Sequence, residues 1–449
     1  MKNKGKTEEM KALKSRHGTA SMILKWTLTI LFSTVVRWLL IYFDFGEVFK
    51  RRVEISSPIT SWFRVEECIT LSQLGLSPYS GDVCHQPPLI VEMFKLLPSK
   101  WTVPFFVVRT FMADLATGIM LSKLCQCYTA SQLSAQDSEK KEYAADTKSI
   151  WIKENSIVHF IVLNLYLLNP FTILTCVAQS TNVINNFVIS LLLFSMSKGY
   201  WSMASICVAF VSYISLYPIM LIVPVILSVK KGANGNMLKI FACLTWFFLT
   251  LFALLYGSYV VNHSWDYIDA VYGFILQAPD LTPNMGLFWY FFLEMFDHFR
   301  LFFLVVYQIN VFIYAIPLAI VFRNRPMILS YALLSLMVLF QSYSNMGNLS
   351  LPFALIPLWS HLYPYMRNFL LIAGMFFFTS LLAPSMWYLW IYAGMGNANF
   401  FYAVTLAYNT AQVFLLSDVL YAFLRHRFHL KNGLSPKTKD GKEGIVIMK

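Results

Sequence analysis

Apolar runs of the length of a membrane-spanning helix recur along almost the whole chain, and short polar turns separate them. A helix that crosses a bilayer needs about 20 consecutive apolar residues. A soluble protein could not hide so many surfaces of this kind, so the pattern predicts an all-α polytopic membrane protein. The clearest runs lie at 22–43, 103–124, 238–260, 300–322 and 368–392.

The remaining apolar runs are shorter, and together they predict one helical bundle over residues 22–424 with about 12 transmembrane helices. A large polar loop at 44–102 follows the first helix, and a polar linker at 125–155, expected to be flexible, follows the second. The other expected helices lie at 156–176, 182–197, 200–216, 217–229, 327–342, 350–364 and 400–423.

The distribution of lysine and arginine sets the expected orientation. Basic residues are concentrated in the tails at 1–21 and 425–449 and at alternate turns. Because positively charged loops stay on the cytosolic side, both termini are expected in the cytosol and the 44–102 loop on the lumenal side. The sequons at Asn262 and Asn348 then fall on the lumenal side.

Composition agrees with this class. The chain has 449 residues, 57% of them hydrophobic, and a mean hydropathy of +0.57. The net charge of +12 invites a nucleic-acid partner. The cations, however, lie at the ends of apolar runs and form no basic stripe on a soluble domain, so no nucleic-acid binding is expected.

Seven cysteines are scattered along the chain, mostly within apolar runs, where a thiol packs as a small hydrophobe. Cys125 and Cys127 form a CxC pattern, which is a weak signal for a metal site. Cys68 and Cys84 share the first loop. They could form a disulfide if that loop lies in an oxidising compartment, and otherwise remain free thiols.

The stretch 286–299 carries ionisable residues among phenylalanines. On one helix, Glu294, Asp297 and His298 are spaced i, i+3 and i+4 and share a face. This predicts a lumenal interfacial helix with a polar stripe, which leads into the next span. A metal site is the alternative, but three residues on one helix do not complete it, so no metal or cofactor is expected.

The sequence "GMGNANFF" interrupts two long apolar runs on the expected lumenal side. Its amides, Asn397 and Asn399, could contact a sugar or phosphate headgroup, since an amide both donates and accepts hydrogen bonds. The alternative is a turn with an asparagine that caps the next helix, and composition alone favours it.

Lys230, Lys231 and Arg323 lie at the cytosolic ends of expected spans. Cations in this position can bind anionic phospholipid headgroups, worth about 1 kcal/mol for each residue. The alternative is that they only fix the orientation of the chain, and the sequence does not separate these two roles.

Catalytic signals are weak, because the chain lacks the GxSxG, HExxH and Walker-type patterns. Asp44 and Glu47 follow the first span as "DFGE". Membrane mannosyltransferases of the C-type glycosyltransferase fold carry a base or metal ligand at a similar position, usually in a paired-acid DxD. Solvated loop acids are the favoured interpretation of this pair.

Several longer stretches resemble one family closely, namely PIG-U, the polytopic membrane subunit of the glycosylphosphatidylinositol (GPI) transamidase complex. They include "GLSPYSGDVCHQPPLI", "SWDYIDAVYGFILQAPDLTPNMGLFWYFFLEMFDHFRLFF" and "LWIYAGMGNANFFYA". The similar stretches follow in order from about residue 75 to residue 425.

The resemblance implies a non-catalytic subunit in the endoplasmic reticulum membrane, with a fold like that of C-type glycosyltransferases. It would bind or present the GPI lipid while a cysteine-protease-like subunit attaches the anchor to protein carboxyl termini. The GPI contact of the family matches Asn397 and Asn399 here, and Glu294, Asp297 and His298 are expected to wall the cavity beside them. The alternative function is an active lipid-linked glycosyltransferase.

Overall fold

The computed structural model describes residues 22, 24–95, 102–153, 155, 157–232 and 236–434. The predicted tail at 1–21 and the last residues of the predicted C-terminal tail, 435–449, lie outside the described residues.

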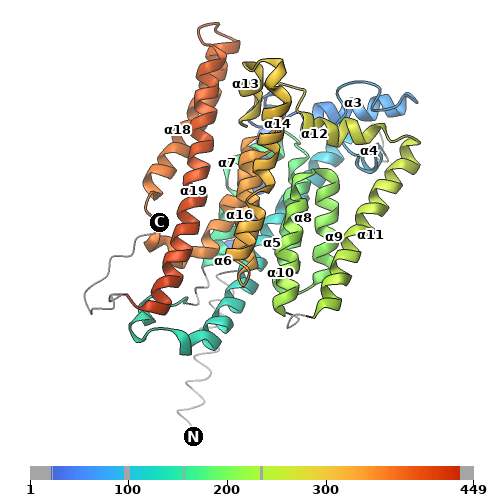
Figure 1. The fold of residues 1–449 in the computed structure, drawn as a ribbon. Helices are drawn as coiled ribbons and strands as arrows, with labels where there is room; N and C mark the ends of the chain where they lie inside the picture. Colours follow the sequence, from blue (N-terminus) through green and yellow to red (C-terminus); the bar gives the residue numbers. More distant parts are fainter. Residues whose placement is uncertain are drawn as a thin grey trace.

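Throughout the described ranges the chain forms helices and no strand, which confirms the all-α class (Figure 1). By length and composition 5 helices can cross a membrane, or 6 if one bent pair counts as a single span. The protein is therefore a polytopic helical membrane protein, and the count of about 12 spans stays a prediction. The 5 helices are Leu24–Tyr42, Met237–Asn262, Asp297–Val321, Phe369–Ile391 and Ala398–Asn432.

The first half of the chain forms a layer of neighbouring helices. Helix α5 packs against α6 and α8, α8 packs against α9, and α9 packs against α11. Helix α7 leaves the axis of α6 at 42°. The bend follows from Pro170, which lacks an amide hydrogen, and Asn169 caps the new helix by accepting a 3.0 Å bond from the Phe171 amide. The helices are α5 (Thr102–Glu139), α6 (Val158–Leu167), α7 (Pro170–Val177), α8 (Asn182–Lys198), α9 (Trp201–Ile214) and α11 (Met237–Asn262).

The linker that the sequence predicts to be flexible forms helices and turns along most of its described length. Helix α5 continues to Glu139, and two short 3-10 turns follow, η1 (Lys140–Glu142) and η2 (Ala145–Ile150). Hydrogen bonds and an ion pair of its polar side chains hold the segment against the bundle. Gln136 Oε1 accepts a 2.8 Å bond from the Ile152 amide, and Arg325 Nη2 lies 2.8 Å from Glu139 Oε2.

The second half surrounds a central helix, α16. Nearly every residue of α16 is buried, which explains why its sequence is apolar on all sides. Helices α18 and α19 form a long hairpin at the edge of the bundle, and α19 packs against both α16 and η6. The elements are η3 (Tyr217–Leu221), α10 (Ile222–Gly232), α15 (Ala315–Val321), α16 (Pro326–Phe340), η5 (Met346–Leu349), α17 (Ser350–Leu355), η6 (Ile356–Tyr365), α18 (Phe369–Ile391) and α19 (Ala398–Asn432).

The large first loop folds into short helices at the same end of the bundle as the α18–α19 turn (Figure 1). They are α2 (Phe45–Lys50), α3 (Trp62–Gln73) and α4 (Pro88–Lys95). Cys68 and Cys84 form a disulfide, so of the two alternatives for this pair the structure has the bonded one. The loop has its own small core, in which Trp62 packs edge-on against Phe94 at 5.4 Å between ring centroids.

The predicted single helix over 286–299 is wrong. Helix α13 (Phe288–Leu293) ends at Leu293 with Glu294 as its C-cap, and α14 (Asp297–Phe312) begins at Asp297. In one continuous helix, Phe291 and Tyr307 would be about 24 Å apart. Their ring centroids lie 4.8 Å apart, because the chain turns back and packs the phenylalanines of α13 onto α14. Before them, a π-helix (η4, Ile268–Gly273) and α12 (Phe274–Gln277) lead from α11.

Candidate functional site

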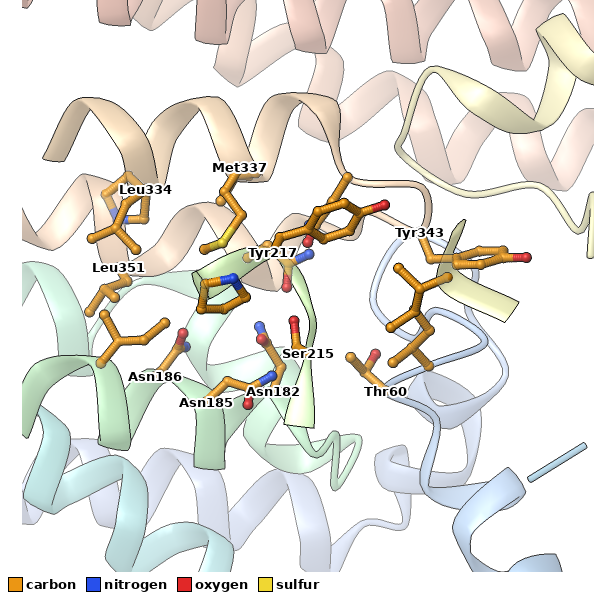
Figure 2. Close-up of a pocket in the computed structure, with 18 residues that line it drawn as sticks. Thr60, Asn182, Asn185, Asn186, Ser215, Tyr217, Leu334, Met337, Tyr343 and Leu351 are labelled. Carbon is orange, nitrogen blue, oxygen red and sulfur yellow. The ribbon is translucent and has the colours of Figure 1, made fainter. Parts of the chain in front are cut away.

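A small polar pocket lies where the start of α8 meets η3, the end of α16 and the chain that follows it (Figure 2). It has a volume of about 50 Å³, which is room for a few water molecules. Apolar side chains from α16 and α17, among them Leu334, Met337 and Leu351, form part of its wall. The polar side chains are Thr60, Asn182, Asn185, Asn186, Ser215, Tyr217, Gln341, Tyr343 and Asn348, and we call this set and its cavity the polar pocket.

Three asparagines in the first turns of α8 give the polar pocket its chemistry. Asn182 is only 5% exposed, and its Nδ2 makes no hydrogen bond to the described chain. The Oδ1 of Asn185 is likewise buried without a partner among the described residues. Asn186 Nδ2, in contrast, donates a 3.2 Å bond to Ser350 Oγ. A buried polar atom without a partner costs about 1–3 kcal/mol, so the first two amides are groups that a ligand or water would satisfy.

The described residues that line the polar pocket include no charged side chain. Asn348, the acceptor of the second sequon, is half-buried in this wall. The site is therefore suited to uncharged groups that both donate and accept hydrogen bonds.

The turn between α18 and α19 holds the two predicted headgroup ligands. Asn397 Oδ1 accepts a 3.3 Å bond from the Phe400 amide and so caps α19, as the capping alternative predicted. Asn397 and Asn399 are both exposed at the tip of the hairpin. Gly394 has a φ of 64°, which strains any residue with a Cβ atom, and this explains a glycine at that point of the turn.

Helix α13 packs directly against this tip. The rings of Tyr290 and Tyr402 lie 4.6 Å apart, and those of Trp289 and Phe401 lie 6.1 Å apart. Tyr402 also donates a 3.2 Å hydrogen bond to the carbonyl of Leu287. The structure thus brings the aromatic segment beside the first turn of α19, only a few residues from the exposed asparagines.

The three ionisable residues predicted to wall a cavity follow α13. Glu294, Asp297 and His298 are exposed, and none of them lines the polar pocket. The break between α13 and α14 separates Glu294 from the other two, so they do not share one helix face. The geometry on which the metal alternative rested is lost. Over the described ranges, no group of His, Cys, Asp or Glu is arranged to hold a metal ion.

A wider cleft opens between α3 and the segment after α11. Arg64 Nη2 lies 2.6 Å from Asp280 Oδ2 across it. Burial acts to raise the pKa of Asp280, but hydrogen bonds from Thr282 and Arg64 outweigh it, so the pKa is lowered. His85 stacks on Phe274 at 3.4 Å between ring centroids. Burial is the largest cause that lowers the pKa of His85 to about 4, so its imidazole is neutral at physiological pH.

The last turn of α10, which carries the predicted phospholipid contacts Lys230 and Lys231, lies at the opposite end of the bundle (Figure 1). Lys230, Lys231 and Arg323 are all exposed. Helices α10 and α15 pack against each other, which brings the two lysines and the arginine to one region. Partial burial of the Lys231 ammonium group and the nearby charge of Arg325 lower its pKa, which is typical of crowded cations.

Two features of the structure have a signal in the sequence. Asn182, Asn185 and Asn186 lie within an apolar run, and three amides in such a run are a signal for a polar cavity. Arg37 and Asp114, which lie inside two expected spans, form a buried ion pair. A charge within an apolar run was the signal that could have identified them.

The fold and these sites define a polytopic membrane protein with polar features at both ends of one helical bundle. The family model described as GPI transamidase subunit PIG-U matches residues 31–408. This chain belongs to the PIG-U family, which confirms the resemblance inferred from its motifs.

Similar proteins agree with this assignment. The human protein named GPI-anchor transamidase component PIGU is 41% identical over 436 residues, which cover 94% of this chain and 99% of the human one. The Saccharomyces cerevisiae protein named GPI transamidase component GAB1 is 28% identical over 374 residues, which cover 83% of this chain and 87% of the yeast one.

Proposed function

We propose that this chain is a non-catalytic subunit of GPI transamidase that binds or presents the GPI lipid. The lipid is then attached to protein carboxyl termini in the endoplasmic reticulum by a cysteine-protease-like partner subunit. Membership of the PIG-U family over residues 31–408 carries this proposal. The human and yeast relatives are both named as components of the transamidase.

The lipid contact is placed at the α18–α19 tip. Asn397 and Asn399 offer exposed amides there, and the aromatic rings of Trp289, Tyr290 and Tyr402 lie immediately below. An amphiphilic ligand needs such a boundary, since its headgroup requires polar partners and its tails require apolar surface. Glu294, Asp297 and His298 follow α13 and would border the headgroup.

The cysteines support a non-catalytic role. A cysteine nucleophile must reach the lumenal substrate as an accessible thiolate. Cys68 and Cys84, the two in the first loop, are joined in a disulfide. The other five lie in helices, and four of them are buried: Cys125, Cys176, Cys207 and Cys243.

The orientation follows from charge and from the disulfide. The first loop and the α18–α19 tip occupy one end of the bundle, and the end of α10 and the start of α16 occupy the other (Figure 1). Disulfides persist in oxidising compartments such as the lumen. We therefore assign the disulfide end to the lumen and both chain termini to the cytosol, in a bundle of about 12 spans.

The glycosyltransferase alternative rests on Asp44 and Glu47. Both are exposed, and Glu47 Oε1 lies 2.7 Å from Lys50 Nζ. Asp44→Ala combined with Glu47→Ala is expected to leave GPI assembly intact. If assembly stopped before the full glycan formed, this protein would be an enzyme of glycan synthesis.

The direct test is Asn397→Ala combined with Asn399→Ala. Surface display of a GPI-anchored reporter should fall, while the other transamidase subunits still co-purify with the variant. Normal display would refute the headgroup contact. Loss of the whole complex would mean that the asparagines serve only the structure of the turn.

A further inference from the structure

Two buried polar atoms of the polar pocket make no hydrogen bond within the described chain. Asn182 Nδ2 is a buried donor without a partner, and Asn185 Oδ1 is a buried acceptor without one. Both residues line the same cavity, where Figure 2 shows them on neighbouring turns of α8. A hydroxyl group satisfies such a pair, because it accepts from one amide and donates to the other.

The charge of the lining limits the ligand. A phosphate in this cavity would carry its charge away from water without a lysine or arginine beside it, which is unfavourable. The described lining supplies only amides, hydroxyls and apolar groups, so an uncharged ligand is preferred. Tyr217 also lines the cavity (Figure 2), and a flat ring can pack against the CH face of a sugar.

The tyrosine hydroxyls themselves are already engaged. Tyr217 Oη lies 2.6 Å from Ser342 Oγ, and Tyr343 Oη accepts a 3.2 Å bond from the Asp280 amide. These bonds fix both rings in place. A volume of about 50 Å³ admits a few oxygen-sized groups, not a whole disaccharide. It matches the hydroxyls along one edge of a ring.

We propose that the polar pocket binds one hydroxyl-bearing edge of an uncharged sugar or cyclitol ring. Asn182 donates to a ring hydroxyl, Asn185 accepts from one, and Tyr217 packs against the ring. The site is separate from the Asn397 and Asn399 tip. The identification of the ring as part of the GPI glycan rests on the proposed function. The preference for an uncharged ring rests on the pocket lining alone.

The test uses the intact transamidase complex purified in detergent. Its thermal midpoint is measured against rising concentrations of methyl α-D-mannopyranoside, and separately of myo-inositol and of inorganic phosphate. A ligand that binds the folded state raises the midpoint saturably. We expect a saturable rise with at least one of the two rings and none with phosphate.

Two variants locate the response. Asn182→Ala removes a donor that has no partner among the described residues, so it should keep the midpoint of the unliganded complex while raising the apparent Kd at least tenfold. Ser215→Leu should abolish the response by filling the cavity. The control is Asn164→Ala, outside the polar pocket, where Nδ2 donates 2.8 Å to the Phe160 carbonyl. It should lower the midpoint and keep the full response to the ring.

Several results would overturn the proposal. A response to phosphate alone would make the pocket an anion site, and no saturable response to either ring would mean that it holds only water. An unchanged apparent Kd in Asn182→Ala would place the binding elsewhere, whether or not Ser215→Leu assembles. Normal reporter display in the Asn397 and Asn399 variant would instead refute the proposed function and leave the pocket untouched.

The source of the ring is tested with cells that cannot make GPI lipids. Native mass spectrometry compares the complex from these cells with the complex from normal cells. A glycolipid retained only from normal cells, and lost with Asn182→Ala, identifies the GPI glycan as the ligand. A sugar-bearing mass retained from both, and lost with Asn182→Ala, identifies another saccharide. Equal retention by wild type and Asn182→Ala counts against the site.

Discussion

Arg37 and Asp114 form an ion pair inside the helical bundle, with only 1% of each side chain exposed. Arg37 comes from the first membrane helix and Asp114 from α5. Arg37 Nη1 also donates a 2.9 Å bond to the carbonyl of Leu167, the last residue of α6. Since the bend before α7 leaves that carbonyl without a helical donor, one arginine satisfies both the carboxylate and the broken helix.

Removing one member of this pair should be much more harmful than removing both. Arg37→Met or Asp114→Leu alone leaves an uncompensated buried charge and is expected to cost about 3–5 kcal/mol. The double variant should recover most of that loss. The measurement is denaturant unfolding of the three variants in mild detergent, analysed as a double-mutant cycle.

Lys140→Met is the control for this cycle. Lys140 pairs with Asp137 on an exposed part of the chain, where an ion pair contributes about 0–1 kcal/mol. Additive losses from Arg37→Met and Asp114→Leu would show that the two side chains are not energetically coupled.

The disulfide gives a test of both stability and orientation. Cys68→Ser with Cys84→Ser frees the first loop and should cost about 2–4 kcal/mol. In sealed microsomes, thiol labelling of the pair should require both reductant and permeabilised membranes. Cys207→Ser, which removes a buried free thiol, is the control. Labelling of the pair without either treatment would contradict the lumenal assignment.

Helix content and the order of the apolar segments could be predicted because a span needs only local information, namely length and composition. The structure differs from the prediction where contacts between residues far apart in the chain determine the conformation. The 286–299 stretch has a helical pattern, yet the chain turns back after α13 and the ring of Phe291 packs against that of Tyr307. The 125–155 linker is polar, yet Arg325 holds it at Glu139. Neither contact is visible from local composition.

The candidate sites divide in the same way. Asn397 could be found because a glycine-rich turn between two apolar runs is a local signal, and its capping bond to Phe400 is also local. The asparagines near the start of α8 are a local signal for a polar cavity, but its other walls could not be predicted, since the polar pocket joins Asn182 to residues such as Thr60 and Tyr343 that lie far from it along the chain. A cavity depends on how helices pack against one another, and that packing cannot be predicted from a single sequence.

The lowered pKa of His85 predicts that the folded protein loses stability in mild acid. Its pKa is about 4 in the folded protein and about 6.5 in an unfolded chain. Between these values the unfolded state binds a proton that the folded state does not, so stability is full above pH 6.5 and falls as the pH drops toward 4. The difference of roughly 2.5 pKa units corresponds to roughly 3 kcal/mol.

The measurement is the thermal midpoint in detergent from pH 4.5 to pH 7, for wild type and His85→Gln. The difference between the two curves should shrink as the pH falls, because the variant has no imidazole to protonate. Arg64 and Asp280 face His85 and belong to both proteins, so their titration cancels in the comparison. His298→Gln, at an exposed position, is the control, and parallel curves for His85→Gln would contradict the prediction.

We expect that replacing the three cations at the proposed cytosolic end selectively reduces the binding of acidic phospholipid. The triple variant Lys230→Ala, Lys231→Ala and Arg323→Ala should retain less acidic phospholipid in native mass spectrometry, since each cation contributes about 1 kcal/mol near an anionic surface. Arg325→Ala is the control, because Arg325 is already paired with Glu139. It should reduce stability more than lipid retention. Unchanged retention in the triple variant would leave orientation as the only role of these residues.

Asn397 combines a structural role with a proposed ligand contact, and substitutions can separate the two. Asn397→Ser keeps an oxygen that can cap α19 but removes the amide donor. Asn397→Ala removes both and should cost about 1 kcal/mol in helix stability. If the amide contacts the GPI headgroup, Asn397→Ser and Asn399→Ala should each lower reporter display while the complex keeps its thermal midpoint. If Asn397→Ser displays the reporter normally and only Asn397→Ala fails, the cap alone explains the residue. Asn432→Ala, at the far end of α19, removes an exposed amide from the same helix and should change neither measurement.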